Sequence, residues 1–154
     1  MNNTDYHIEI ETKASPQRAT AAINEVATWW GADLDGSSEK VGDQFTIHFG
    51  TTFVDFQITD IIPGETVVWR VTGCDLPWLQ DKQEWLNHKL IFEVNEAAGG
   101  SRISFTQIGL TPVQECYTGC EKGWNFYIGE SLKALLDTGT GKPDTKRSER
   151  VEVK

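Results

Sequence analysis

The stretch VQECYTGCEKGWNFYIGESLKALLD, residues 113–137, decides how this chain folds. On a helical wheel at about 100° per residue, its apolar and small side chains gather in one arc, and its charged side chains face away from that arc. A long helix with one buried face must lie across a layer of other elements, and glycine at position 139 is a residue type that favours helix ends. The arc contains Val113, Cys116, Tyr117, Cys120, Trp124, Tyr127, Ile128, Ser131 and Leu135.

The segments before this helix alternate between apolar and polar residues, which is typical of antiparallel strands with one buried face. Strands are expected over residues 5–13, 44–50, 53–62, 66–71, 84–96 and 101–109. After the first strand, Ser15-Pro16 predicts a short helix, because serine caps a helix and proline fits its first turn. A second helical turn carries Trp29 and Trp30. The expected fold is therefore α+β, a curved antiparallel sheet of six to seven strands wrapped on the long C-terminal helix.

Charge and composition narrow the function. The 154 residues carry a formal net charge of −9, which disfavours nucleic acid and anionic membrane surfaces as partners. No apolar run is long enough to span a bilayer, and the polar start lacks a signal-peptide pattern, so a cytoplasmic location is expected. Nucleotide-binding, serine-nucleophile and metalloprotease motifs are missing, so neither cofactor nor metal is expected. Residues 1–140 are expected to form one domain, and residues 141–154 a flexible tail.

Four segments resemble a known family. They are VATWWG (26–31), EWLNHKLIFEV (84–94), ISFTQIGL (103–110) and ECYTGCEKGWNFYIGESLKALLDTGTG (115–141). Together with the element order, they resemble the START and Bet v 1 superfamily, in the branch named after the activator of Hsp90 ATPase. The resemblance implies the helix-grip fold. It leaves the function open among several classes, because this superfamily includes lipid carriers, cyclases, hydrolases and co-chaperones.

An apolar cavity between the sheet and the C-terminal helix is the expected binding site, since such sites combine apolar walls with few polar groups. The favoured function is a non-enzymatic module that binds a small hydrophobic ligand there. The alternatives are a cyclase- or hydrolase-type enzyme using His88, or a protein-interaction domain with an exposed patch around Trp78, Leu79 and Trp85. The candidate ligand-binding residues are Phe45, Phe56, Trp69, His88, Phe92, Phe105, Gln107, Cys116, Cys120, Trp124 and Tyr127.

Several of these positions allow two interpretations. His88 is either a core histidine satisfied by Gln107, Tyr127 or Ser131, or a polar anchor or general base in the cavity. Gly123 either lets helix and sheet approach closely or leaves room for a ligand. Trp78 either folds back onto Trp29 or Trp30, or stays exposed as a lid or contact residue.

The number and spacing of the cysteines predict reduced thiols. Cys116 and Cys120 are four residues apart on the buried face of the helix, where free cysteine is common. An odd number of cysteines in a chain without a leader favours reduced thiols over a disulfide framework. A zinc site would need more ligands than this pair and His88 supply.

Overall fold

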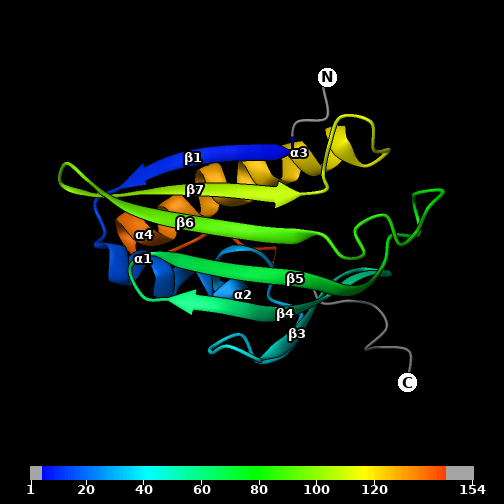
Figure 1. The fold of residues 1–154 in the computed structure, drawn as a ribbon, viewed down its shortest axis with the longest axis horizontal. Coiled ribbons are helices and arrows are strands. Elements are labelled where there is room, and N and C mark those ends of the chain that lie inside the picture. The colour runs from blue at the N-terminus through cyan, green and yellow to red at the C-terminus, as the bar shows by residue number, and fades with distance from the viewer. Residues whose placement is uncertain (1–4, 145–154) are drawn as a thin grey trace.

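The computed structural model of the protein describes residues 5–144 (Figure 1). It confirms the predicted α+β class, with strands followed by a long C-terminal helical segment. In chain order the elements are β1 (Tyr6–Thr12), α1 (Pro16–Ile23), α2 (Val26–Trp29), β2 (Leu34–Gly36), β3 (Gln44–Phe49), β4 (Thr52–Ile62), β5 (Thr66–Asp75), β6 (Lys89–Ala97), β7 (Gly100–Ile108), α3 (Tyr117–Phe126), the π-helical turn η1 (Tyr127–Leu132) and α4 (Lys133–Thr138).

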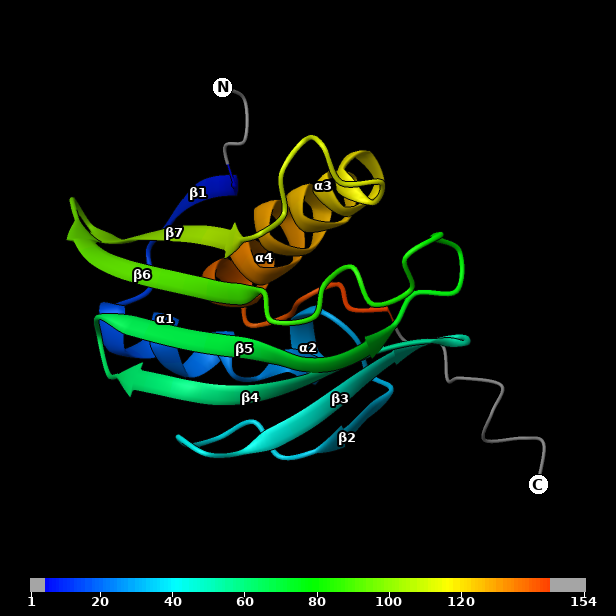
Figure 2. The same cartoon turned by 45° about the vertical axis from the view of Figure 1, so that its right-hand side comes forward.

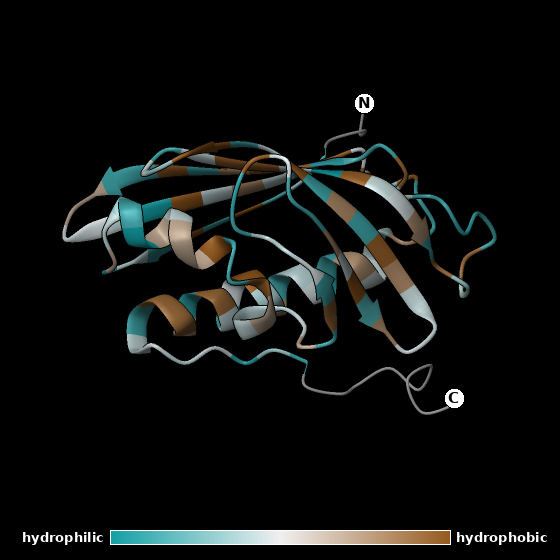
Figure 3. Ribbon diagram, turned by 90° about the horizontal axis from the view of Figure 1, so that it is seen from below, coloured by the Kyte–Doolittle hydropathy of each residue, from teal (hydrophilic) through white to brown (hydrophobic). Residues whose placement is uncertain are grey.

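The seven described strands form one antiparallel sheet in the order β1-β7-β6-β5-β4-β3-β2. Consecutive strands are neighbours from β2 to β7, and β1 adds to the free edge of β7. The register along β4 shifts between Asp55 and Phe56 and again between Ile58 and Asp60. Such irregularities increase local bend and twist. The sheet curves around the helices, which all lie on its concave side (Figures 2 and 3).

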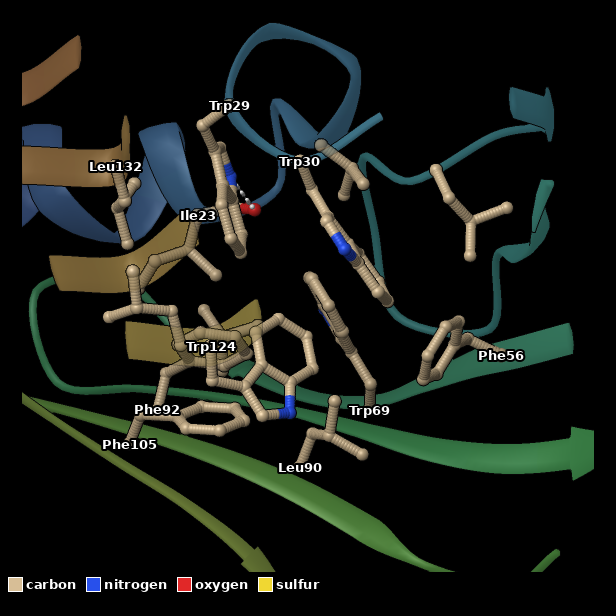
Figure 4. Packing of buried hydrophobic residues seen from close by; sticks show 14 of the residues in the cluster. Ile23, Trp29, Trp30, Phe56, Trp69, Leu90, Phe92, Phe105, Trp124 and Leu132 are labelled. Carbon is tan, nitrogen blue, oxygen red and sulfur yellow. Dashed lines mark hydrogen bonds between the residues drawn. The ribbon is translucent and has the colours of Figure 1, made fainter. Parts of the chain in front are cut away.

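The concave side of the sheet is packed with aromatic rings (Figure 4). Ring centroids lie 4.9 Å apart for Trp69 and Phe92, 4.8 Å for Phe92 and Phe105, and 5.4 Å for Phe56 and Trp69. These distances are those of ring pairs in direct contact. The space between the middle of the sheet and the helices is therefore filled by protein.

The helix after β1 begins as the sequence predicts. The Ser15 side chain accepts a hydrogen bond from the Arg18 amide at 3.1 Å, and Pro16 occupies the first helical turn. The indole of Trp29, buried under this helix, donates to the carbonyl oxygen of Ile23 at 3.0 Å. The connection between α1 and α2 is thereby held against the core.

The C-terminal helical segment differs from the single helix expected over residues 113–137. Helix α3 begins at Tyr117, and Val113 lies in the preceding turn with 77% of its surface exposed, so its predicted burial is wrong. From Tyr127 the chain makes the π-helical turn η1, which adds a residue to the turn and shifts the buried face. Leu132 and Leu136 are consequently buried beside Ser131 and Leu135. Within the described residues, no helix is long and apolar enough to cross a membrane.

Polar links hold this segment to the rest of the fold. Buried Ser131 donates to the carbonyl oxygen of Trp29 at 2.7 Å and accepts from the Lys142 amide at 2.7 Å. At the far end, Thr12 on β1 donates to Asp137 at 2.6 Å. The chain then returns along α2, where the Asp144 amide donates to the carbonyl oxygen of Trp30 at 2.9 Å. The rest of the expected tail, residues 145–154, lies outside the described residues.

We predict that Ser131→Ala lowers the free energy of unfolding by about 1–3 kcal/mol, because it leaves the buried carbonyl of Trp29 without its partner and removes the acceptor of the Lys142 amide. Urea denaturation measures the loss. Thr138→Ala is the matched control, since the Thr138 hydroxyl also bonds a helix carbonyl but is exposed, and should change stability by less than about 0.5 kcal/mol. Equal losses in the two variants would contradict this role for Ser131.

Candidate functional site

The loop between β5 and β6 is fastened to the start of α3. The Glu84 carboxylate accepts from the amides of Glu115 at 3.0 Å and Cys116 at 3.1 Å. In return, the Glu115 carboxylate accepts from the Gln80 amide at 2.9 Å. Because the first amides of a helix lack partners within it, Glu84 caps α3 from a distant segment. Figure 2 shows this loop at the same end of the sheet as the start of α3.

Trp85 turns inward in this loop, contrary to its expected place in an exposed patch. The sequence alternation predicts a strand from residue 84, whereas β6 begins at Lys89 after a turn in which Asn87 has a φ of 70°. The turn reverses the expected facing, so Trp85 is buried and Leu86 is 38% exposed. The Trp85 indole stacks on Trp124 with centroids 6.2 Å apart, and its N–H donates to Cys116 Sγ at 3.3 Å.

A cavity of about 190 Å³ opens beside this stack. Its wall combines the end of α2, the β3–β4 hairpin, the β5–β6 loop, α3 and the first residue of η1. One side is formed by Trp30 and Trp124, whose centroids are 4.7 Å apart (Figure 4). The lining residues are Trp30, Phe49, Thr52, Val54, Leu76, Trp78, Trp85, Cys120, Gly123, Trp124 and Tyr127.

The cavity wall is apolar and uncharged. Among residues 5–144, no carboxylate, lysine, arginine or histidine lines it, and its polar side chains are Thr52, Tyr127 and the indoles. Burial, followed by the charge of Asp144, raises the pKa of the Tyr127 phenol, so the hydroxyl stays protonated at neutral pH. The cavity therefore presents aromatic surface with few hydrogen-bonding groups.

Gly123 faces open space at this cavity. A Cβ built on Gly123 would meet no atom within 4 Å apart from neighbours in its own helix. Of the two interpretations of this glycine, the structure therefore excludes close approach to the sheet. The missing side chain instead enlarges the cavity.

Cys116 and Cys120 are joined in a disulfide, so the expectation of two reduced thiols is wrong. Their Cα atoms are 5.7 Å apart, within the range that a disulfide spans. The spacing of one helical turn brings the two residues to this distance. The prediction relied on the odd number of cysteines, which carries no information about that distance. Cys74, which is buried, is the free cysteine of the described residues.

Behind the cavity, Trp124, Gln107 and His88 form a hydrogen-bonded chain. The Trp124 indole donates to Gln107 Oε1 at 2.8 Å, and Gln107 Nε2 lies 2.9 Å from His88 Nδ1. Because an indole N–H can only donate, it sets the amide orientation, and the amide N–H then donates to Nδ1. His88 accordingly carries its proton on Nε2. Of the candidate partners of His88, the structure pairs it with Gln107.

Burial lowers the pKa of His88 to about 4, and the charge of Asp5 opposes this shift. The imidazole is therefore neutral at pH 7. It packs against the backbone at Gly109, where a Cβ would overlap the ring and where φ is 108°. His88 is thus enclosed by the protein and does not line the cavity.

Three of the candidate ligand-binding residues line the cavity, namely Cys120, Trp124 and Tyr127. The other eight lie in the packed interior or behind the wall. These are Phe45, Phe56, Trp69, His88, Phe92, Phe105, Gln107 and Cys116. Within residues 5–144, no three His, Cys, Asp or Glu side chains lie close enough together to hold a metal ion.

The strand pattern did not identify the lining residues contributed by loops and by the β3–β4 hairpin. The sequence did indicate Trp78, because a tryptophan after proline in a long loop suggests a contact residue. In the structure Trp78 is 55% exposed and lines the cavity. Leu79 and Trp85, expected with it in an exposed patch, are buried.

We predict a pH dependence of stability that belongs to His88. The unfolded histidine titrates near pH 6.5 and the folded one near 4, so the unfolded chain binds more protons between these values. The free energy of unfolding should fall as the pH drops through this window, by about 2–3 kcal/mol, and this contribution levels off below pH 4. Urea denaturation at a series of pH values measures it.

His88→Asn should remove this part of the pH dependence, because its amide oxygen can still accept from Gln107 but does not titrate in the window. His7→Asn is the control, since the His7 side chain is 44% exposed. A His88→Asn variant with the same pH profile as the unsubstituted chain would show that the buried imidazole is not its source.

Comparisons with known proteins agree with this fold. Similar solved structures include the Aha1 dimer from Colwellia psychrerythraea, with a TM-score of 0.74 and 24% identity over 89% of this chain and 98% of that chain. A Mesorhizobium loti protein has a TM-score of 0.68 and 20% identity, over 85% and 95% of the two chains. A Staphylococcus saprophyticus protein has a TM-score of 0.68 and 12% identity, over 92% and 98%. At these identities the likeness shows the shared fold.

A search of curated protein sequences found no match. The sequence model of one family, described as activator of Hsp90 ATPase homolog 1-like protein, matches residues 18–137. This match covers most of the chain, including most of α1, strands β2 to β7 and most of the C-terminal helical segment. The chain therefore belongs to the activator of Hsp90 ATPase homolog 1-like family, whose helix-grip fold is that of a ligand-binding or interaction module.

Proposed function

We propose that this protein binds a small, flat, apolar ligand of one or two rings in the cavity beside Gly123. The observation that carries the proposal is the open space over Gly123, faced by the rings of Trp30, Trp85 and Trp124. Glycine inside a helix costs stability relative to alanine, by about 0.5–1 kcal/mol. A glycine that packs against nothing at the wall of an aromatic cavity is accounted for if a ligand takes the space.

The size of the cavity indicates the size of the ligand. Its volume is about 190 Å³. An apolar cavity of about 150 Å³ accommodates benzene, whereas sites for drug-sized molecules begin at about 300 Å³. A single ring or a compact two-ring compound fits between these limits. A long acyl chain does not, because the rest of the concave side is filled by core aromatics such as Trp69 and Phe92.

The wall also indicates the shape and polarity of the ligand. Flat rings gain from offset or edge-on contact with other aromatic rings beyond the area that they bury. The described part of the chain places no charged side chain in the wall, which disfavours a ligand with a buried charge. The protonated Tyr127 hydroxyl and the Thr52 hydroxyl can each donate one hydrogen bond, which suits a ligand with a single oxygen or nitrogen at its edge.

The geometry gives less support to the other two functions. An enzyme using His88 would need the imidazole in the cavity, whereas it lies behind the wall with one nitrogen bonded to Gln107. An interaction domain of the kind expected would need an exposed patch of Trp78, Leu79 and Trp85. Two of these three are buried, which leaves Trp78 alone.

Gly123→Leu should abolish ligand binding without harming the fold, because leucine fills the cavity and favours the helix more than glycine does. Isothermal titration calorimetry with indole and 2-naphthol measures the affinity. We expect binding to the unsubstituted chain and a loss of at least about tenfold in the variant, equivalent to about 1.4 kcal/mol. Dodecanoate and choline serve as long-chain and cationic comparisons and should bind no better than the two aromatic compounds.

The matched control is Gly119→Leu. Gly119 lies in the same helix with open space around it but does not line the cavity. It should bind indole and 2-naphthol as the unsubstituted chain does. If neither compound binds, or if both leucine variants weaken binding equally, the cavity is not the site.

A further inference from the structure

The disulfide is built asymmetrically into the cavity wall. Cys116 is the N-cap residue of α3 and is 1% exposed, covered by the Trp85 indole that donates to its sulfur. Cys120 lies one turn later, is partly exposed, and forms part of the cavity wall. A reagent from solution therefore reaches the bond from the Cys120 side, through the cavity.

The surroundings of Cys116 also favour it as the sulfur that leaves. A thiolate is a better leaving group when hydrogen-bond donors and a helix N-terminus stabilise its charge. The Trp85 N–H lies 3.3 Å from Cys116 Sγ, and α3 starts at the next residue. The nearby Glu84 carboxylate opposes a negative charge, but its two oxygens already accept from the amides of Glu115 and Cys116.

From this geometry we propose that Cys116–Cys120 is a reversible redox site, exchanged by low-molecular-weight thiols that enter the cavity and attack Cys120. This proposal does not depend on the cavity binding an aromatic ligand. Low-molecular-weight thiols of this kind are abundant in reducing compartments, where disulfides are mostly transient rather than structural.

The exchange proceeds in two steps. The thiolate of the small thiol attacks Cys120 Sγ, the Cys116–Cys120 bond breaks, and Cys116 leaves as a thiolate that takes up a proton from water. A second small thiolate then attacks the sulfur of the first small thiol in the mixed disulfide, and Cys120 is released as a thiolate. In total, the protein disulfide and two small thiols give two protein thiols and one small disulfide, a transfer of two electrons. A small disulfide drives the reverse reaction.

The intermediate places the small molecule on the cavity wall. In the mixed disulfide, Cys120 carries the attacking group where the cavity is lined by Trp85 and Trp124. The cavity is small, so this group competes with any other occupant for the same space. The cavity is therefore occupied in the mixed disulfide and free of this group in the disulfide and dithiol states.

The first test follows the unsubstituted chain in buffers of reduced and oxidised glutathione, with alkylation of free thiols and mass spectrometry. We expect Cys116 and Cys120 to gain and lose alkylation together as the buffer becomes more reducing or more oxidising, while Cys74 is unchanged. If the two cysteines remain alkylated in oxidising buffer, or if reduction needs denaturant, the proposal is overturned.

The second test shows which of the two sulfurs a small reagent reaches, with Cys74→Ser in every variant so that one thiol remains to attack the reagent. With 2-hydroxyethyl disulfide, Cys116→Ser should form a mixed disulfide at Cys120 at least about tenfold faster than Cys120→Ser forms one at Cys116. Adding Gly123→Leu to Cys116→Ser should slow the reaction, and adding Gly119→Leu should not. Equal rates for the two cysteines, or no effect of Gly123→Leu, would exclude attack through the cavity.

Discussion

The structure depends on how the Trp124 indole is held between the helix and the sheet. Its ring contacts Trp30 at 4.7 Å and Phe105 at 5.0 Å between centroids, and its N–H donates to Gln107 on β7. A buried indole needs both apolar contact and a partner for its N–H, and this position supplies both. One residue of α3 is thereby fixed to α2 and to the sheet, and the helix has a single orientation across the concave side.

Large aromatic side chains fill the middle of that concave side, and the open space lies at one end of it. There the β5–β6 loop leaves the sheet, and α3 has a glycine where most residues would fill the gap. The core and the cavity share Trp30 and Trp124, which contact the packed interior on one side and the cavity on the other. The same two rings therefore stabilise the core and shape the cavity.

The β5–β6 loop is held by polar and sulfur contacts rather than by a sheet. Glu84 caps α3, and Trp85 covers the disulfide and stacks on Trp124. These contacts connect the covalent state of Cys116 and Cys120 to the position of a ring in the cavity wall. The π-helical turn begins at Tyr127, another wall residue, so the helix changes its geometry where the cavity ends. Such turns occur often at functional sites.

Alternating residues in β1, β3, β4, β5 and β7 and the periodicity of residues 113–137 were enough to predict the fold and the inward facing of Trp69 and Trp124. They also made Gln107 one of the candidate partners of His88. Local periodicity indicates which face of an element is buried, and these predictions depend on that information alone. The turn at Asn87, the disulfide and the cavity were decided by the tertiary structure. An unfilled volume depends on how side chains from distant segments fit together, and no single segment contains that information.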